Sequence, residues 1–344
     1  MPNRIAYIDL AKGFCISIVM LFHIRGIASY ELPFGPVLFY SLMLPPFFFI
    51  AGVFYNANIG LKAFLKKKTN VLLIPFIFFY LTTSVLIPNF LHYGFGMHFE
   101  TVIGWPSLWA FIWPGEYPNI PLWFLWCLFV MEVLFFMFIS IIRLVTAKHA
   151  KSLLLLLCLS FAIIGHGLED YLSTDIACLF KALQNLPFLC LGYITSEFST
   201  HLQKTLRRRT SFLLSIASLA VASLPMLILP LPSTIAGSIF YCLCGLAGSY
   251  FILSLSALIH YLPLFNYLGR YSIIIVLTHG LIVRAGYPLF TKFSTYLGEY
   301  GSVFLFWVVM ALSYLVIIPL LRATMPHVTA QKNIFKSISS NMHE

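Results

Sequence analysis

About ten apolar runs, each close to the length that crosses a lipid bilayer, follow one another along this chain of 344 residues. Apolar residues make up 60% of the sequence and charged residues only 9%, whereas soluble domains carry roughly 25% charged residues. A soluble fold of this length could not bury so much apolar surface. The sequence therefore predicts an all-α polytopic membrane protein, a bundle of about ten transmembrane helices near residues 5–27, 37–56, 71–89, 122–142, 152–168, 176–196, 211–229, 234–258, 271–288 and 301–321.

The basic residues gather in short clusters between these runs. Because the clusters follow every second run, counted from the N-terminus, the positive-inside rule predicts that both termini are cytoplasmic. The net charge of +10 then indicates topology and does not indicate binding to nucleic acid. The clusters are Arg4/Lys12, Lys62/Lys66/Lys67/Lys68, Arg143/Lys148/Lys151, Lys204/Arg207/Arg208/Arg209, Arg270 and Arg322/Lys332/Lys336.

The domain organisation follows from the same pattern. Residues 1–321 are predicted to form one transmembrane domain, and residues 322–344 a basic cytoplasmic tail that we expect to be flexible. The long outer connection, residues 90–121, is rich in Gly, Pro, Trp and Tyr. Its aromatic rings suit either an interfacial belt or a platform that stacks on sugars. The seven cysteines lie in apolar runs without zinc-ligand spacing, so we expect free thiols and no metal site.

The first run carries polar and ionisable residues along one face, and such residues are costly within a bilayer. Asp9 and Lys12 are spaced to pair across one helical turn. Lys12 and His23 are eleven residues apart, so they share a stripe and are separated along the helix axis by about 16 Å. Ionisable groups within a span are functional candidates. The alternative is that an anchoring Lys12 and an interfacial His23 are aligned by chance.

Two more titratable residues fall in the middle of predicted spans. Glu132 has no basic partner one turn away, so it must face the bundle interior, be protonated, or meet a cation from another helix. His279 shares a helix face with Ser272, seven residues earlier. A lone histidine there is either a packed, hydrogen-bonded residue or a functional one.

Other polar and small residues have simpler explanations. Lys181, Gln184 and Asn185 form a short polar face in the sixth run, and Lys181 is close enough to the outer edge to extend its amine into the interface. Ala51 and Gly52 in the second run are small enough to allow close helix packing. We expect structural roles for both groups.

The opening segment RIAYIDLAKGFCISIVMLFH resembles the membrane-bound acyltransferase 3 family, in particular its fucose-4-O-acetylase-like branch. The matching positions are Arg4, Asp9, Lys12, Gly13 and His23. Three further segments resemble the family, in order along the chain. Many members carry an Arg-x-x-Arg pair near the third span, where this chain has three lysines at 66–68. The further segments are FFFIAG at 47–52, PLWFLWCLF at 121–129 and LGRYSIIIVLTHGLI at 268–282.

The resemblance implies transfer of an acetyl or other acyl group from cytoplasmic acyl-CoA to a hydroxyl of a cell-surface polysaccharide, such as lipopolysaccharide, or of its lipid-linked precursor. Such an enzyme resides in the bacterial inner membrane and takes acetyl-CoA as a substrate, with no bound cofactor. His23 suits the role of general base, because imidazole accepts a proton near neutral pH. Lys12 and Asp9 would orient the donor, and Lys12 could favour its phosphates or the oxyanion. The residues expected to contact substrate or support catalysis are Glu132, His279, Trp123 and Ser272.

Two other functions stay open. A transporter or flippase of lipid-linked sugars would also have many spans with scattered charges, but it needs no histidine in register with Lys12. A glycan polymerase or ligase would want a basic outer loop, and residues 90–121 contain neither Lys nor Arg.

Overall fold

A computed structural model of the chain describes residues 5–28, 35–98, 101–112, 117–145, 149–172, 174–196, 204–228 and 235–335. Within these ranges all regular structure is helical, without strands, as predicted. One π-helical turn joins α2 to α3, and two others divide the helical stretch that runs from α4 to α6. The helices are α1 (Ala6–Ala28), α2 (Gly35–Val37), α3 (Pro45–Val53), α4 (Leu61–Lys68), α5 (Ile74–Tyr80), α6 (Ile87–Phe95), α7 (Trp123–Val145), α8 (Ala150–Leu172), α9 (Leu179–Ser196), α11 (Arg209–Ile228), α12 (Ile235–Ile259), α13 (Pro263–Arg270) and α14 (Ser272–Thr324).

Eight helical segments of the described chain are long and apolar enough to cross a membrane. Each of the predicted runs coincides with helix, but the seventh run lies on α11, whose apolar part, Arg209–Leu224, is shorter than a full span. The ninth and tenth runs both lie on α14, which counts as one segment. The polytopic helical architecture is confirmed, while the count of ten and the cytoplasmic placement of both termini stay predictions.

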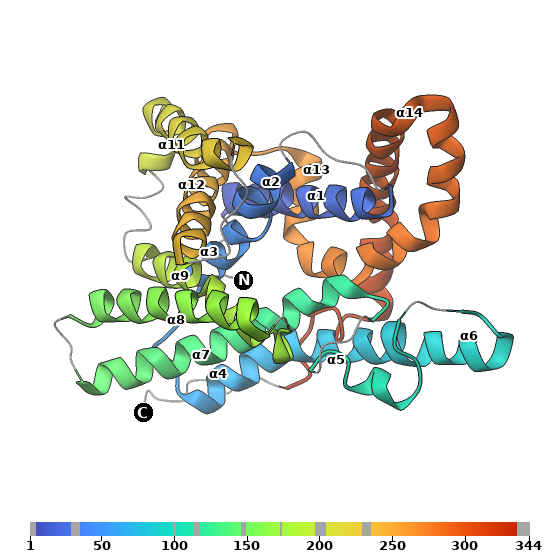
Figure 1. The fold of residues 1–344 in the computed structure, drawn as a ribbon, viewed down its shortest axis with the longest axis horizontal. Coiled ribbons are helices and arrows are strands. Elements are labelled where there is room, and N and C mark those ends of the chain that lie inside the picture. Colours follow the sequence, from blue (N-terminus) through green and yellow to red (C-terminus); the bar gives the residue numbers. More distant parts are fainter. Residues whose placement is uncertain are drawn as a thin grey trace.

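The helix α14 folds back on itself, as Figure 1 shows. Gly298 has a left-handed φ of 67°, which interrupts the helix. On the two sides of this break, Thr278 and Tyr314 are joined by a hydrogen bond of 3.1 Å between their hydroxyl groups. The rings of Phe290 and Phe306 also lie 6.1 Å apart. The two arms are therefore antiparallel neighbours, and they correspond to the ninth and tenth predicted runs.

Glycines allow two pairs of helices to cross with their backbones in contact. A Cβ atom on Gly13 of α1 would overlap the carbonyl oxygen of Phe265 in α13, and one on Gly269 of α13 would overlap that of Asp9. The same reciprocal arrangement joins α3 and α9, where Gly52 packs on Leu189. Small residues at such crossings let helices approach closely. The packing role expected for Gly52 is confirmed.

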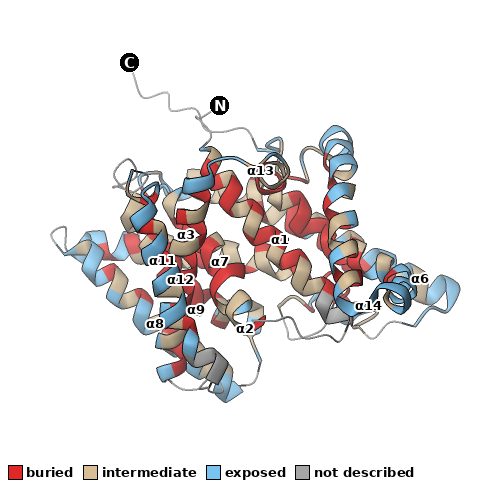
Figure 2. Cartoon of the chain, turned by 90° about the horizontal axis from the view of Figure 1, so that it is seen from above, coloured by how far each residue is buried: buried red, intermediate tan, exposed pale blue. Residues whose placement is uncertain are grey.

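The apolar core is divided into two clusters, and α1 contributes to both. Ala11 and Cys15 belong to one cluster with α3, α7 and α9, whereas Ile16 and Met20 belong to the other with α5 and α14. Buried residues line α1, α3 and α7, and exposed residues cover α6 and the outer face of α8 (Figure 2). Many exposed residues are large and apolar, such as Leu156 at 62%. Such a surface suits contact with lipid.

The described segment after α14 contacts the bundle at Asn70. The side-chain amide of Asn70 donates to the carbonyl of Phe335 and accepts from the backbone amides of Ile334 and Phe335, each at 3.0 Å. One buried amide thus satisfies three backbone groups of the tail, while the flexibility expected for residues 322–344 stays a prediction. The seven cysteines are free thiols, and all but Cys178 are buried.

The crowded Gly13 at the crossing of α1 and α13 and an uncrowded glycine elsewhere predict opposite effects of a Gly→Ala substitution on stability. Gly13→Ala places a methyl group against backbone, which cannot rotate away, so we expect a loss of roughly 1–3 kcal/mol in folding free energy. Gly167→Ala, on α8, meets no atom within 4 Å and should stabilise the helix by up to about 1 kcal/mol. Thermal unfolding of the detergent-purified variants, followed by size-exclusion chromatography, measures both. Equal stability of the two variants would contradict the crossing.

Candidate active site

Two histidines from distant parts of the chain meet inside the bundle. His23 lies near the end of α1, and His279 lies in the first arm of α14. Their ring centroids are 4.7 Å apart, with an interplanar angle of 86°. His279 is fully buried. His279, for which the sequence left a packing role and a functional role open, is therefore the neighbour of His23.

Both imidazoles present the same nitrogen to the backbone. The Nδ1 atom of His23 lies 2.8 Å from the carbonyl oxygen of Val19, and that of His279 lies 2.7 Å from the carbonyl of Ile275. A carbonyl can only accept, so in the neutral rings Nδ1 carries the proton and Nε2 keeps its lone pair. The Nε2 atom of His279 is buried without a hydrogen-bond partner among the described residues. The arrangement leaves Nε2 as the proton-accepting atom of each ring.

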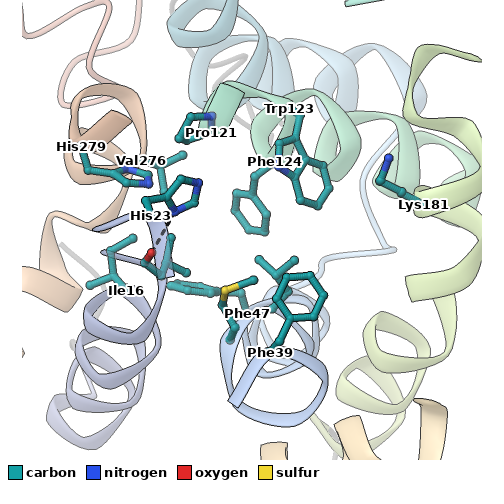
Figure 3. A pocket seen from close by; sticks show the side chains of 13 residues that line it. Ile16, His23, Phe39, Phe47, Pro121, Trp123, Phe124, Lys181, Val276 and His279 are labelled. Atoms are coloured by element: carbon teal, nitrogen blue, oxygen red, sulfur yellow. Dashed lines mark hydrogen bonds between the residues drawn. The ribbon is translucent and has the colours of Figure 1, made fainter. Parts of the chain in front are cut away.

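A cavity of about 270 Å³ lies beside this pair, and we call it the histidine cavity. The two histidines occupy one side, the rings of Trp123 and Phe124 face them, and Lys181 lies at the far side (Figure 3). Apart from Lys181 the rest of the wall is apolar, so the imidazoles are the polar groups that a molecule bound beside them would meet. Its other lining residues are Ile16, Val19, Phe39, Met43, Leu44, Phe47, Pro121 and Val276.

Asn119 fixes the start of α7 against α14 and thereby shapes the cavity. This side chain is fully buried. Its Nδ2 atom donates to the hydroxyl of Thr83 at 3.1 Å and to the carbonyl of Leu277 at 3.0 Å. The bond to Leu277 holds α14 beside the turn that carries Pro121. Sequence reasoning missed Asn119, because an asparagine at the end of a long loop has an ordinary turn role.

A second cavity, also of about 270 Å³, lies next to the first and contains a cluster of amines. We call it the lysine cavity. The two cavities share three wall residues, Phe47, Phe124 and Val276. These apolar side chains separate a charged compartment from the histidines. The polar residues of the lysine cavity are Lys12, Lys67, Lys68, Glu132 and Ser272.

Glu132 is buried in the wall of the lysine cavity and is paired. Its Oε1 atom lies 2.5 Å from the Nζ atom of Lys68, and the two side chains are 3% and 16% exposed. The Lys68 amine also lies 5.6 Å from the centre of the Tyr55 ring. Of the alternatives that the sequence left for Glu132, the structure selects a cation from another helix. A glutamate in lipid needs such a partner, because an isolated charge there is costly.

The predicted site residues thus divide between two compartments. His23, His279 and Trp123 line the histidine cavity, whereas Lys12, Glu132 and Ser272 line the lysine cavity. The spacing of Lys12 and His23 along α1 agrees with this division. Asp9 lines neither cavity, and its carbonyl packs against Gly269 of α13. Within the described ranges no group of three or more His, Cys, Asp or Glu residues could hold a metal ion.

A third cavity, of about 420 Å³, was not anticipated. We call it the amide chamber. Lys181, Gln184 and Asn185 line it, together with His166 and Glu169 from α8. The sequence showed the polar face of Lys181, Gln184 and Asn185 and predicted a structural role for it. What it did not show is that this face meets the polar end of α8 across a cavity.

Comparison with known proteins identifies the family of the chain. The model of the acyltransferase 3 family, described as an acyltransferase domain, matches residues 5–322. The chain therefore belongs to the acyltransferase 3 family, and with its apolar helices it is a multi-pass membrane acyltransferase. No curated protein and no solved structure matches it significantly. The resemblance of the four sequence segments is confirmed for the family, while the fucose-4-O-acetylase-like branch stays a prediction.

The pair of Lys68 and Glu132 predicts strong coupling in a double-mutant cycle. Lys68→Met leaves a buried carboxylate unpaired and should cost roughly 3–5 kcal/mol of folding free energy. Adding Glu132→Gln removes that charge and should restore part of the loss. Lys62→Met, on the exposed face of the same helix, serves as the control. Thermal unfolding in detergent measures the cycle, and additive effects would show that the two side chains are not paired.

Proposed function

We propose that this protein is an O-acetyltransferase. It moves an acetyl group from cytoplasmic acetyl-CoA, or another acyl-CoA, to a hydroxyl of a cell-surface polysaccharide such as lipopolysaccharide, or of its lipid-linked precursor, in the bacterial inner membrane. His23 is the general base. The observation that carries the proposal is the histidine pair, with Nδ1 of each ring held by a backbone carbonyl. It lines a cavity that shares wall residues with both the lysine cavity and the amide chamber.

The chemistry follows from the position of the free imidazole nitrogen. As the acceptor hydroxyl attacks the thioester carbonyl carbon, His23 Nε2 takes its proton, and a tetrahedral oxyanion forms. The oxyanion then collapses, the C–S bond breaks, and the imidazolium returns the proton to the departing CoA sulfur. The products are the ester and CoA-SH. The apolar wall opposite the histidines excludes water, which would otherwise compete as acceptor.

The lysine cavity suits the phosphate-bearing part of the donor. Lys12, Lys67 and Lys68 bring amines to one compartment, and Lys68 is already paired with Glu132. Amines attract phosphates as point charges. A pantetheine arm is thin enough to pass between helices, and Phe47, Phe124 and Val276 mark where it would enter the histidine cavity. On the predicted topology, Lys12 faces the cytoplasm, where acyl-CoA is made.

The remaining predicted residues take supporting roles in this proposal. His279 packs edge-on against His23 and fixes its ring. Trp123 faces the histidines across the cavity, where it would contact the acceptor (Figure 3). Glu132 holds Lys68, and Ser272 lies in the wall where the donor would bind. Asp9 helps to position α1 on α13, because its carbonyl forms part of their closest contact.

The general-base role predicts the phenotype of one substitution. In a deletion strain, the wild-type gene should restore O-acetyl groups on the surface glycan, and His23→Ala at a matched protein level should restore less than about 1% of them, because a general base contributes roughly 100- to 10,000-fold. The measurement is NMR or mass spectrometry of the extracted glycan. His327→Ala, in the exposed tail segment, is the matched control.

Each outcome of that comparison has a meaning. Full acetylation by His23→Ala would refute the base assignment. If the wild-type gene changes no acetyl signal but alters the movement of lipid-linked glycan across the membrane, the chain acts as a transporter of lipid-linked sugars.

The donor role of the lysine cavity predicts a dependence on the nucleotide part of CoA. Lys12→Met should raise the KM for acetyl-CoA by roughly ten-fold, because it removes one charge-assisted contact with phosphate. The same substitution should leave the KM for S-acetyl-pantetheine unchanged, since that thioester lacks the nucleotide phosphates. Steady-state thiol release by the purified protein measures both, with Lys62→Met as the control. Equal changes for the two donors would contradict phosphate binding at Lys12.

A further inference from the structure

The amide chamber adjoins the Lys181 end of the histidine cavity, and its polar wall is built from four helices, with Phe39 and Tyr40 of the π-helical turn Leu38–Met43 completing it. Its volume of about 420 Å³ lies in the range of small-molecule sites, roughly 300–1,000 Å³. Unlike the histidine cavity, its wall combines aromatic rings with amide, carboxylate and imidazole groups. Trp123 comes from α7, His166 and Glu169 from α8, Gln184 and Asn185 from α9, and Tyr241 from α12.

The polar groups of this wall hold one another in place. Gln184 Nε2 donates to Glu169 Oε2 at 2.5 Å, and the hydroxyl of Tyr241 donates to Asn185 Oδ1 at 2.8 Å. Each bond joins two different helices. A pre-organised polar wall loses little conformational entropy when a ligand binds. An interfacial position of Lys181 does not account for two such bonds between helices beside a cavity.

One group in the chamber lacks a partner. The Nε2 atom of His166 is buried and makes no hydrogen bond with any described residue. Its ring packs edge-on against Tyr241 at 5.7 Å, which limits its rotation. A buried polar atom without a partner costs roughly 1–3 kcal/mol. A ligand hydroxyl placed in the chamber would satisfy it.

The charges around the chamber favour an uncharged ligand. Among the described residues of its wall, Lys181 is the only Lys or Arg, and two carboxylates lie close to this amine. Asp175 Oδ2 lies 3.5 Å from Lys181 Nζ, and Glu169 Oε1 lies 4.0 Å from it. A phosphate or a sugar carboxylate would therefore meet no unbalanced positive charge, and it would be repelled by Glu169.

The chamber has one exposed end, and on another side it adjoins the histidine cavity. The side chains of Glu169 and Lys181 are 38% and 40% exposed, which places the mouth at their end. Four wall residues, Phe39, Leu44, Trp123 and Lys181, also line the histidine cavity. A molecule in the chamber thus reaches the boundary at Trp123, and across the histidine cavity from Trp123 stands His23 (Figure 3).

From these observations we infer that the amide chamber is the acceptor subsite and that it binds an uncharged sugar residue. Gln184, Asn185 and His166 bond its hydroxyls, and Trp123 packs on its C–H face. The inference rests on the proposed function, because the sugar hydroxyl at the Trp123 boundary is the one that His23 would deprotonate. Glu169 and Tyr241 act as positioning residues, since each holds an amide of the wall.

The test separates binding from transfer. The probes are neutral and acidic oligosaccharides, released by mild acid from the surface polysaccharide of the deletion strain and separated by anion exchange. Thermal stabilisation of the purified wild-type protein by each fraction measures binding without any donor. In parallel, transfer from radiolabelled acetyl-CoA to the neutral fraction gives separate KM values for acceptor and donor.

Gln184→Leu and Tyr241→Phe are the informative variants, because the second removes one hydroxyl with almost no change of volume. Gln331→Leu, in the tail segment, is the matched control for the first. We expect the neutral fraction alone to stabilise the wild type. We also expect Gln184→Leu to raise the acceptor KM roughly ten-fold and Tyr241→Phe to raise it less. Neither variant should change the KM for acetyl-CoA.

Several results would overturn the inference. One is wild-type protein that neither fraction stabilises, or that the acidic fraction stabilises equally. Another is folded Gln184→Leu with an unaltered acceptor KM, or with equal changes in both KM values. Stabilisation by neutral oligosaccharide that is lost in Gln184→Leu, without any acetyl transfer by the wild type, would support the subsite and refute the proposed O-acetyltransferase activity.

Discussion

The hydrocarbon core of a bilayer supplies no hydrogen bonds, so each ionisable side chain within the bundle must find its partner in the chain itself. Glu132 finds Lys68, and His23 and His279 bond to carbonyls one turn earlier in their own helices. These bonds use one side of each group. Each of the three side chains also lines a cavity. The partners that the lipid environment requires therefore also orient the polar groups in the cavity walls.

The position of α1 is what relates the cavities to one another. The contact of Gly13 with Phe265 presses this helix against α13 and limits its rotation about its own axis. Lys12 and His23 therefore reach separate compartments, although both lie on one helix. The other half of the histidine pair depends on α14, which is fixed by its fold-back at Gly298 and by the bond from Asn119 to Leu277. A change at either contact would separate the two imidazoles without altering them.

The sequence predicted individual helix faces well and their partners poorly. The stripe of Lys12 and His23 follows from the 3.6-residue period, and the structure places both residues in cavities. The partner of Glu132 was left open, because Lys68 comes from another helix. For Gln184 the wheel of α9 shows a polar face, but the carboxylate that holds it, Glu169, lies on α8. A pattern within one helix contains no information on which other helix its polar face meets.

What the sequence by itself determined is the helical, membrane-embedded class, the location of the apolar runs, the axial order of Lys12 and His23, and the family. These properties depend on hydropathy over some 20 neighbouring residues, on helical periodicity and on ordered motifs, all of which are local in the chain. Only the tertiary structure decided that His279 adjoins His23, that Lys68 neutralises Glu132, and that Gln184 and Asn185 face a chamber. Cavities form between helices that are distant in sequence, and their walls depend on close glycine crossings and on the turn at Gly298, which no single helix specifies.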